Sequence, residues 1–136
     1  QSRGLGADAV LLIAAILDYP RLLHLVELTL GLGMEPLVEV HNRQELTAAL
    51  DTPTRVIGVN NRNLQDFAVS LDTSLELAGL IPDHITKISE SGIKNRADVE
   101  LLREVSYDAV LVGEALVTAG NAAEKLCELA GQVDTR

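Results

Sequence analysis

Five short apolar segments, separated by amphipathic stretches of helical length, limit the fold more than any other feature of this sequence. The segments span residues 7–16, 35–40, 55–60, 84–88 and 107–112 and consist largely of valine, isoleucine, leucine and alanine. Short apolar segments of this kind are typical of strands that are buried on both faces of a sheet. We therefore expect five β-strands that share one hydrophobic core.

Helical patterns occupy the intervals after these segments. They cover residues 20–32, 42–50, 72–80, 96–105 and 121–129. Two of them begin with a capping signal, in which Asn42 precedes Glu45 and Asn121 precedes Glu124 by three positions. The repeated β-α order predicts an α/β fold with parallel strands and right-handed crossovers. Such units form either an open doubly wound sheet or part of a barrel, and the periodicity alone does not choose between them.

The composition restricts the classes of partner. A formal net charge of −9 argues against nucleic acid and anionic membranes as partners. A phosphorylated small molecule stays a suitable ligand, because backbone N–H groups at helix N-termini bind phosphate whatever the net charge. No apolar run reaches the roughly 18 residues of a membrane span. The single cysteine, Cys127, favours a reducing, cytoplasmic location.

The chain shows one composition from end to end, without a linker or a low-complexity tract, so we expect residues 1–136 to belong to a single domain. No spacing of histidine, cysteine or acidic residues matches a metal site. No nucleotide-binding glycine motif or nucleophile elbow is present. We therefore expect neither a metal nor a cofactor.

Polar residues gather where the predicted strands end, which is where ligands bind in both architectures. Glu39 lies within an apolar strand, and carboxylates are almost never buried without a partner. It is a candidate general acid or base, or a group that stabilises a cationic intermediate. Glu90 is a similar candidate in a more polar stretch. The alternative for both residues is a solvated strand end or a structural ion pair.

Asn60 and Arg62 follow the third predicted strand. The asparagine offers a donor and an acceptor, and the arginine offers a planar fork for a carboxylate or a phosphate. The neighbouring Asn61 and Asn63 are candidates for a role in the turn alone. His41 is the only histidine near the predicted active face, and we favour a helix-start role for it.

Gly92 and Gly113 each stand where one of the last two predicted strands turns toward a helix. Glycine lets the backbone approach a ligand closely, and helix N-termini bind phosphate. In barrels, a pair of such turns on the last two strands is typical of a phosphate site. We expect the backbone at Gly92 and at Gly113–Glu114 to bind an anion. The alternative is that the glycines only permit tight turns.

Taken together, these segments resemble successive signatures of the indole-3-glycerol phosphate synthase family. The resemblance rests on residues 6–13 (GADAVLLI), 37–41 (LVEVH), 57–64 (IGVNNRNL), 89–93 (SESGI) and 110–116 (VLVGEAL). They occur in the family's order and spacing and cover nearly the whole chain. The combination is specific, although SESGI alone is a weak signal.

The resemblance implies the C-terminal half of a (β/α)8 TIM barrel, with the five apolar segments as strands four to eight. It implies closure of the indole ring of 1-(2-carboxyphenylamino)-1-deoxyribulose 5-phosphate, with release of CO2 and water, in tryptophan biosynthesis. It implies catalytic roles for Glu39, Asn60 and Glu90. The implied substrate and phosphate contacts are Arg62, Ser91, Gly92, Gly113 and Glu114. Glu114 is expected to contribute its backbone N–H, with its side chain turned away from the phosphate.

The family's catalytic lysines and its first glutamate belong to strands one and three, which this sequence lacks. A full barrel has about 250 residues. We therefore expect the chain alone to be inactive and to need the N-terminal half of the barrel as a partner. Two alternatives stay open: a non-catalytic half-barrel, natural or engineered, that self-associates, and another phosphate-binding barrel such as a relative of phosphoribosylanthranilate isomerase. The combination of Glu39, Asn60 and SESGI argues against the second.

Overall fold

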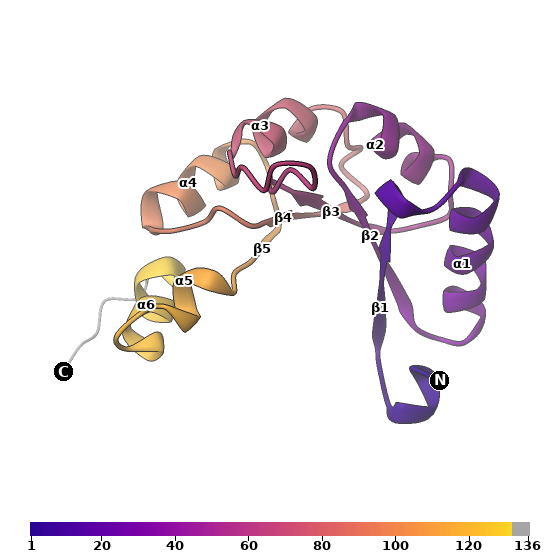
Figure 1. Cartoon of the computed structure of the whole chain (residues 1–136), viewed down its shortest axis with the longest axis horizontal. Coiled ribbons are helices and arrows are strands. Elements are labelled where there is room, and N and C mark those ends of the chain that lie inside the picture. The colour runs from indigo at the N-terminus through magenta and orange to yellow at the C-terminus, as the bar shows by residue number, and fades with distance from the viewer. Residues whose placement is uncertain (132–136) are drawn as a thin grey trace.

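A computed structural model of the chain describes residues 1–131 and shows five strands that alternate with helices (Figure 1). The strands are β1 (Ala9–Ile13), β2 (Glu35–Val40), β3 (Val56–Asn60), β4 (Thr86–Glu90) and β5 (Ala109–Leu111). The helices are α1 (Tyr19–Gly31), α2 (Arg43–Leu50), α3 (Asp72–Ala78), α4 (Arg96–Glu104), α5 (Glu114–Val117) and α6 (Ala122–Ala130). Two short 3-10 helices are η1 (Arg3–Leu5) and η2 (Ala14–Ile16). The expected β-α order is confirmed.

The five strands form one parallel sheet in the order β1-β2-β3-β4-β5. The spatial order follows the chain without the reversal that defines a doubly wound sheet. Helices α1 to α4 accordingly lie in an arc on one side of the strands (Figure 1). This is the arrangement of consecutive (β/α) units in a barrel. Of the two architectures that the periodicity left open, the chain therefore forms part of a barrel and not an open doubly wound sheet.

The two faces of the sheet differ in what covers them. We call the face toward the helices the outer face and the opposite face the inner face. On the outer face, Val38, Val40, Ile57 and Val59 are completely buried. They belong to one core with the buried helix side chains Leu22, Val26, Leu46, Ala49, Leu77 and Leu102. The sheet and its helices thus share a single aliphatic core, as the sequence predicts.

Side-chain caps fix the starts of several helices. Asn42 accepts a hydrogen bond from the backbone N–H of Glu45, and Asn121 caps α6 in the same way. Both caps confirm the sequence signals. Two further caps were not anticipated: Asp18 accepts the backbone N–H of Arg21 at the start of α1, and Asn95 and Asp98 form a reciprocal capping box at the start of α4. These caps satisfy N–H groups that have no partner within the helix.

Several element boundaries differ from the predicted ones, among them those of the first and fourth strands. The first predicted strand ends at Ile13, because the chain tightens there into η2, where Leu17 N–H bonds to the Ala14 carbonyl. The fourth begins at Thr86, because Ile85 N–H closes a turn onto Pro82, and it runs on to Glu90. The short helix α5 was not anticipated. None of the helices within residues 1–131 is long and apolar enough to cross a membrane.

Candidate active site

Two carboxylates meet on the inner face of the sheet. Glu39 on β2 pairs in register with Gly58 on β3, and Glu90 stands at the end of the next strand, β4. Both glutamates are only 5% exposed. A Cβ atom at position 58 would overlap Oε1 of Glu90. The bare backbone of Gly58 therefore provides the space in which the two carboxyl groups come together.

Their closeness changes the acidity of one of them. Burial raises the pKa of Glu90, and the charge of Glu39 and a side-chain hydrogen bond with Glu39 raise it further, from 4.5 to about 7. Oε1 of Glu90 is buried without a hydrogen-bond donor, which agrees with the large cost of burying a carboxylate. Near neutral pH, Glu90 thus exists in both protonation states, as a group that transfers protons should.

His41 links the carboxylate pair to helix α2. Its Nε2 lies 3.1 Å from Oε1 of Glu39, and its Nδ1 lies 3.0 Å from Oε2 of Glu45. Its backbone N–H also donates to Glu45, at 2.8 Å. The helix-start role expected for His41 is therefore present, but the contact with Glu39 was not foreseen. Among the residues that the structure describes, no group of three or more histidine, cysteine, aspartate or glutamate side chains is placed to hold a metal ion.

Asn60 and Arg62 lie at the end of β3 and just beyond it. Oδ1 of Asn60 accepts the backbone N–H of Arg62 at 3.0 Å, which fixes the turn. The guanidinium Nη2 of Arg62 lies 3.0 Å from Oε2 of Glu114. The Glu114 side chain thus lies against Arg62, and the expectation that it turns away from a bound phosphate stays a prediction. The carboxylate of an exposed residue is drawn to the nearest guanidinium, and that partner lies 52 positions away in the sequence.

A small cavity of about 210 Å³ brings the expected anion-binding residues together. Its lining includes Arg62, Ser91, Gly92, Gly113 and Glu114. The sequence therefore identified residues that meet at one place. The full lining of the cavity runs from Arg62 to Ala115, which are 53 positions apart in the sequence. The cavity opens where β4 and β5 end.

The two glycines of this cavity differ in their structural requirement. Gly92 has a φ of +80°, and a Cβ there would contact the side chain of Val69. Gly113 has a φ of −116° and open space beside it. Only Gly113 directly precedes a helix, because α4 does not begin until Arg96. Glycine is thus required by the fold at position 92, whereas at position 113 the fold leaves the choice open.

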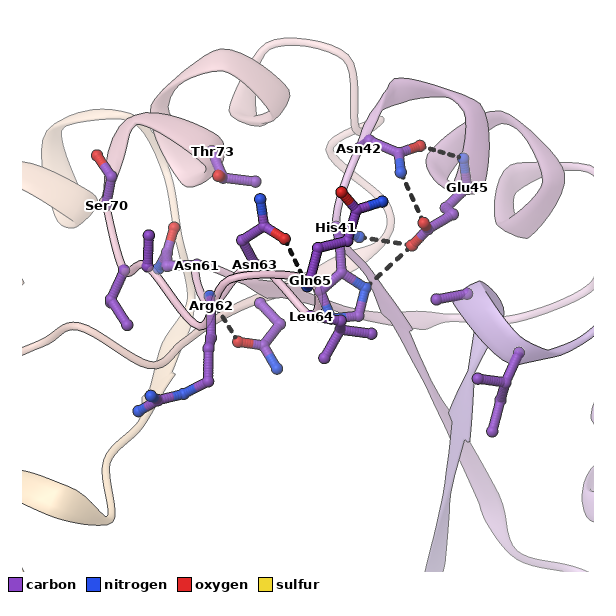
Figure 2. A pocket seen from close by; sticks show the side chains of 15 residues that line it. His41, Asn42, Glu45, Asn61, Arg62, Asn63, Leu64, Gln65, Ser70 and Thr73 are labelled. Atoms are coloured by element: carbon purple, nitrogen blue, oxygen red, sulfur yellow. Dashed lines mark hydrogen bonds and ion pairs between the residues drawn. The ribbon is translucent and has the colours of Figure 1, made fainter.

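A larger cavity of about 760 Å³ adjoins the first residues of α2 and the loop between β3 and α3 (Figure 2). His41, Asn42 and Glu45 line one side of it, and the loop lines the other. Arg62 lines both this cavity and the smaller one. A chamber of this volume accepts a metabolite-sized ligand. The larger and the smaller cavity therefore share one cationic side chain.

One residue near the site was underestimated from the sequence. Asn61, expected to serve only the turn, is 2% exposed and donates its side-chain amide to groups at the end of β4. The asparagine doublet directly after an apolar strand was the available signal. It did not reveal the partners, because they lie 28 to 30 positions further along the chain.

Comparison of the solved structures places the fold among known barrels. The 3-hexulose-6-phosphate synthase from Salmonella typhimurium matches with a TM-score of 0.79 and 14% identity, over 95% of this chain and 63% of that chain. The thiamine phosphate pyrophosphorylase from Pyrococcus furiosus matches with a TM-score of 0.72 and 16% identity, over 96% of this chain and 61% of that chain. At these identities the likeness shows the fold alone.

The sequence comparisons are more specific. An indole-3-glycerol phosphate synthase of Dehalococcoides mccartyi is 50% identical over 129 residues, which is 95% of this chain and 50% of that protein. One from Pelodictyon phaeoclathratiforme is 49% identical over 119 residues, which is 88% of this chain and 46% of that protein. The chain thus spans about half the length of these curated relatives. The family model described as indole-3-glycerol phosphate synthase matches residues 1–129, and the chain therefore belongs to that family.

Proposed function

We propose that this chain is the C-terminal part of a single (β/α)8-barrel domain and supplies the carboxylates and the phosphate site of an indole-3-glycerol phosphate synthase. The reaction closes the indole ring of 1-(2-carboxyphenylamino)-1-deoxyribulose 5-phosphate and releases CO2 and water. The observation that carries the proposal is the convergence of Glu39 and Glu90 over Gly58, beside cavities that share Arg62. The proposal includes a cytoplasmic setting, since Cys127 has no second cysteine to pair with.

The carboxylate pair would transfer protons during the reaction. Ring closure with loss of water requires one group to accept a proton and another to donate one. The pKa of Glu90 is raised to about 7 by burial and by Glu39, so near neutral pH Glu90 can hold a proton beside the Glu39 carboxylate. Two neighbouring carboxyl groups that share one proton divide the acid and base roles in this way.

The anionic parts of the substrate would bind at the two cavities. The turns at Ser91–Gly92 and Gly113–Glu114 would hold the phosphate through backbone N–H groups. Arg62 would bind a negatively charged substrate group from its place between the cavities. Its present partner, Glu114, is 77% exposed, and an exposed ion pair contributes only about 0.2–1 kcal/mol. A bound anion can therefore displace the Glu114 carboxylate at small cost.

We further propose that the chain alone does not catalyse ring closure. No lysine of residues 1–131 stands at the C-terminal end of a strand: Lys87 is buried in mid-strand with its Nζ 3.4 Å from Asp83, and Lys94 lies beyond the Ser91–Gly92 turn. The resemblance implies that the missing lysines belong to strands one and three. A partner that carries those strands, the N-terminal half of the barrel, would complete the site.

The uncovered inner face supports a second candidate, a half-barrel that associates with a copy of itself. Leu11 on β1 and Leu111 on β5 are 49% and 51% exposed on the two edge strands. Exposed apolar side chains on unpaired strand edges favour association. Self-association would bury this face without supplying a lysine at the site, so it predicts a larger mass without activity.

One experiment separates these possibilities. The chain is purified, its mass in solution is measured, and ring closure is assayed with and without a separately produced N-terminal half. We expect no activity from the chain alone and activity on mixing. Full activity of the chain alone would refute the requirement for a partner. A stable dimer that neither binds the N-terminal half nor gains activity would favour the self-associating half-barrel.

A further inference from the structure

We propose that Asn61 is a positioning residue, whose side-chain amide holds the Ser91–Gly92 turn in the conformation that presents its backbone N–H groups to a phosphate. The inference rests on the proposed function, since it concerns the anion site described there. Asn61 is not among the residues that line the anion cavity. It lines the larger cavity instead, so its effect on an anion bound between the Ser91–Gly92 and Gly113–Glu114 turns is expected to pass through the first of these turns.

The side chain of Asn61 is bonded to the end of β4 through its amide nitrogen. Nδ2 donates to Oγ of Ser89 at 3.0 Å, to the carbonyl of Glu90 at 3.0 Å and to the carbonyl of Ser91 at 3.1 Å. The backbone N–H of Asn61 also donates to the Glu90 carbonyl, at 2.8 Å. The two hydrogens of one amide thus serve three acceptors on consecutive residues.

The amide oxygen of Asn61 is anchored on the opposite side. Oδ1 accepts the backbone N–H of Ser74, in the first turn of α3, at 3.1 Å. Helix α3 needs this bond, because Leu71 at its N-cap provides no side-chain acceptor. The oxygen must accept and the nitrogen must donate, so the orientation of the buried amide is fixed. Asn61 therefore connects the start of α3 rigidly to the end of β4.

The turn that Asn61 binds has an unfavourable backbone conformation. Ser91 has a φ of +63° and Gly92 a φ of +80°, so two consecutive residues adopt the left-handed conformation. A serine rarely does so, and a residue keeps such a conformation only where its surroundings impose it. The carbonyls that Asn61 binds belong to Glu90 and to Ser91 itself, on both sides of the strained residue. The hydrogen bonds of Asn61 therefore hold the backbone directly before and after Ser91, the residue with the unfavourable φ.

Two nearby residues provide matched controls. Ser74 is fully buried, and its Oγ lies 2.8 Å from Oγ of Ser89. Ser74→Ala removes a buried hydrogen bond of the same network but leaves the bonds between Asn61 and the turn. Asn63, in the same loop, is exposed, and its Oδ1 accepts the Gln65 N–H. Asn63→Asp repeats the chemical change of the main variant at a position without contact to the turn.

The main variant is Asn61→Asp. It keeps the shape of the side chain but places a carboxylate oxygen where Nδ2 donates, opposite the carbonyls of Glu90 and Ser91. Inorganic phosphate is titrated into the isotope-labelled chain, and its affinity is read from the amide signals of Gly92 and Gly113. We expect Asn61→Asp to bind phosphate about tenfold or more weakly, as the loss of a buried hydrogen bond predicts. Ser74→Ala and Asn63→Asp should stay within about twofold of the unmodified chain.

The outcomes separate this inference from the proposed function. If the unmodified chain binds phosphate and Asn61→Asp binds it equally well, the inference is overturned and the anion site stands. If the unmodified chain binds no phosphate at Gly92 and Gly113, the proposed anion site fails. The backbone chemical shifts of Ser91, which report the sign of φ, then decide the inference: a positive φ retained in Asn61→Asp overturns it, and a lost one supports it. Should Asn61→Asp not fold, the neutral variant Asn61→Ser gives the same test.

Discussion

The two faces of the sheet differ in which side chains they bury. On the outer face, Val38, Ile57 and Val59 have no exposed area and pack against the helices. On the inner face, Leu11 and Leu111 are about half exposed, while polar groups are buried. Apart from the buried Lys87 and Ser89, which pair in register with Ile57 and Val59, the outer face thus has the composition of an ordinary core. The inner face buries Glu39 and Glu90 and leaves Leu11 and Leu111 on the edge strands exposed, an arrangement that favours stability less than that of the outer face.

The largest effect expected from this comparison concerns catalysis. In a complete barrel that contains these strands, Glu39→Gln should lower turnover about 10²–10⁴-fold, because it removes the charge of a general acid or base and keeps its shape. Substrate affinity should change much less. Steady-state kinetics measures both. Glu35→Gln is the control: Glu35 lies on the same face of β2 at the opposite end of the strand. Near-normal turnover of Glu39→Gln would make Glu39 a structural residue.

A second prediction compares stability on the two faces. Ile57→Ala on the outer face should lower the free energy of unfolding by about 2–5 kcal/mol, the usual cost of such a deletion in a packed core. Leu111→Ala on the inner face should cost roughly 1 kcal/mol or less, since half of the side chain is already in water. Urea denaturation of the isolated chain measures both values.

The same two variants sharpen the comparison when a partner is present. If the N-terminal half of the barrel covers the inner face, the cost of Leu111→Ala should increase in the complex, and the cost of Ile57→Ala should not change. Equal costs for the two variants in the isolated chain would contradict the distinction between the faces. They would mean that something already covers Leu111, as a second copy of the chain would.

Features of the structure that depend on residues close together in the sequence were predictable, and features that depend on residues far apart were not. The order of the elements and the Asn42 cap follow from neighbours within a few positions, and both were predicted. The end of β4 was missed because Ser89 and Glu90 are polar, although the fold buries them. The orientation of Glu114 depends on Arg62, which lies 52 positions away. No local pattern encodes such a pairing.

The candidate site shows the same division. The sequence placed Glu39, Asn60 and Glu90 at strand ends, because a carboxylate or an amide inside an apolar segment is conspicuous. It also identified the glycine turns that line the anion cavity. It did not predict that Gly58 leaves space for the side chain of Glu90, since Glu90 belongs to another strand. The residues at the site were predictable, whereas the residues that position them were not.

The last effect expected from this comparison is a pH dependence that arises from the buried carboxyl pair. Burial and Glu39 raise the pKa of Glu90 from 4.5 to about 7 in the folded chain. Between these values the folded state holds more protons than the unfolded state, so Glu90 makes the free energy of unfolding fall as the pH rises. Below pH 4.5 this contribution is fully favourable, and above pH 7 it is lost.

Glu90→Gln removes this titration, so the stability of the variant relative to the unmodified chain should depend on pH. The difference in free energy of unfolding, variant minus unmodified chain, should shift in favour of the variant as the pH rises from 4.5 to 7 and level off above it. Other titrating groups are common to both proteins and cancel in the difference, provided that Glu39 is followed separately with Glu39→Gln. That second variant removes the charge of Glu39, which is one cause of the shift, so it should lower the pKa of Glu90 and weaken the same pH dependence. A difference that stays constant over this range would show that Glu90 titrates as an ordinary surface carboxyl group, and the inner face would then lose the property that distinguishes it from the outer one.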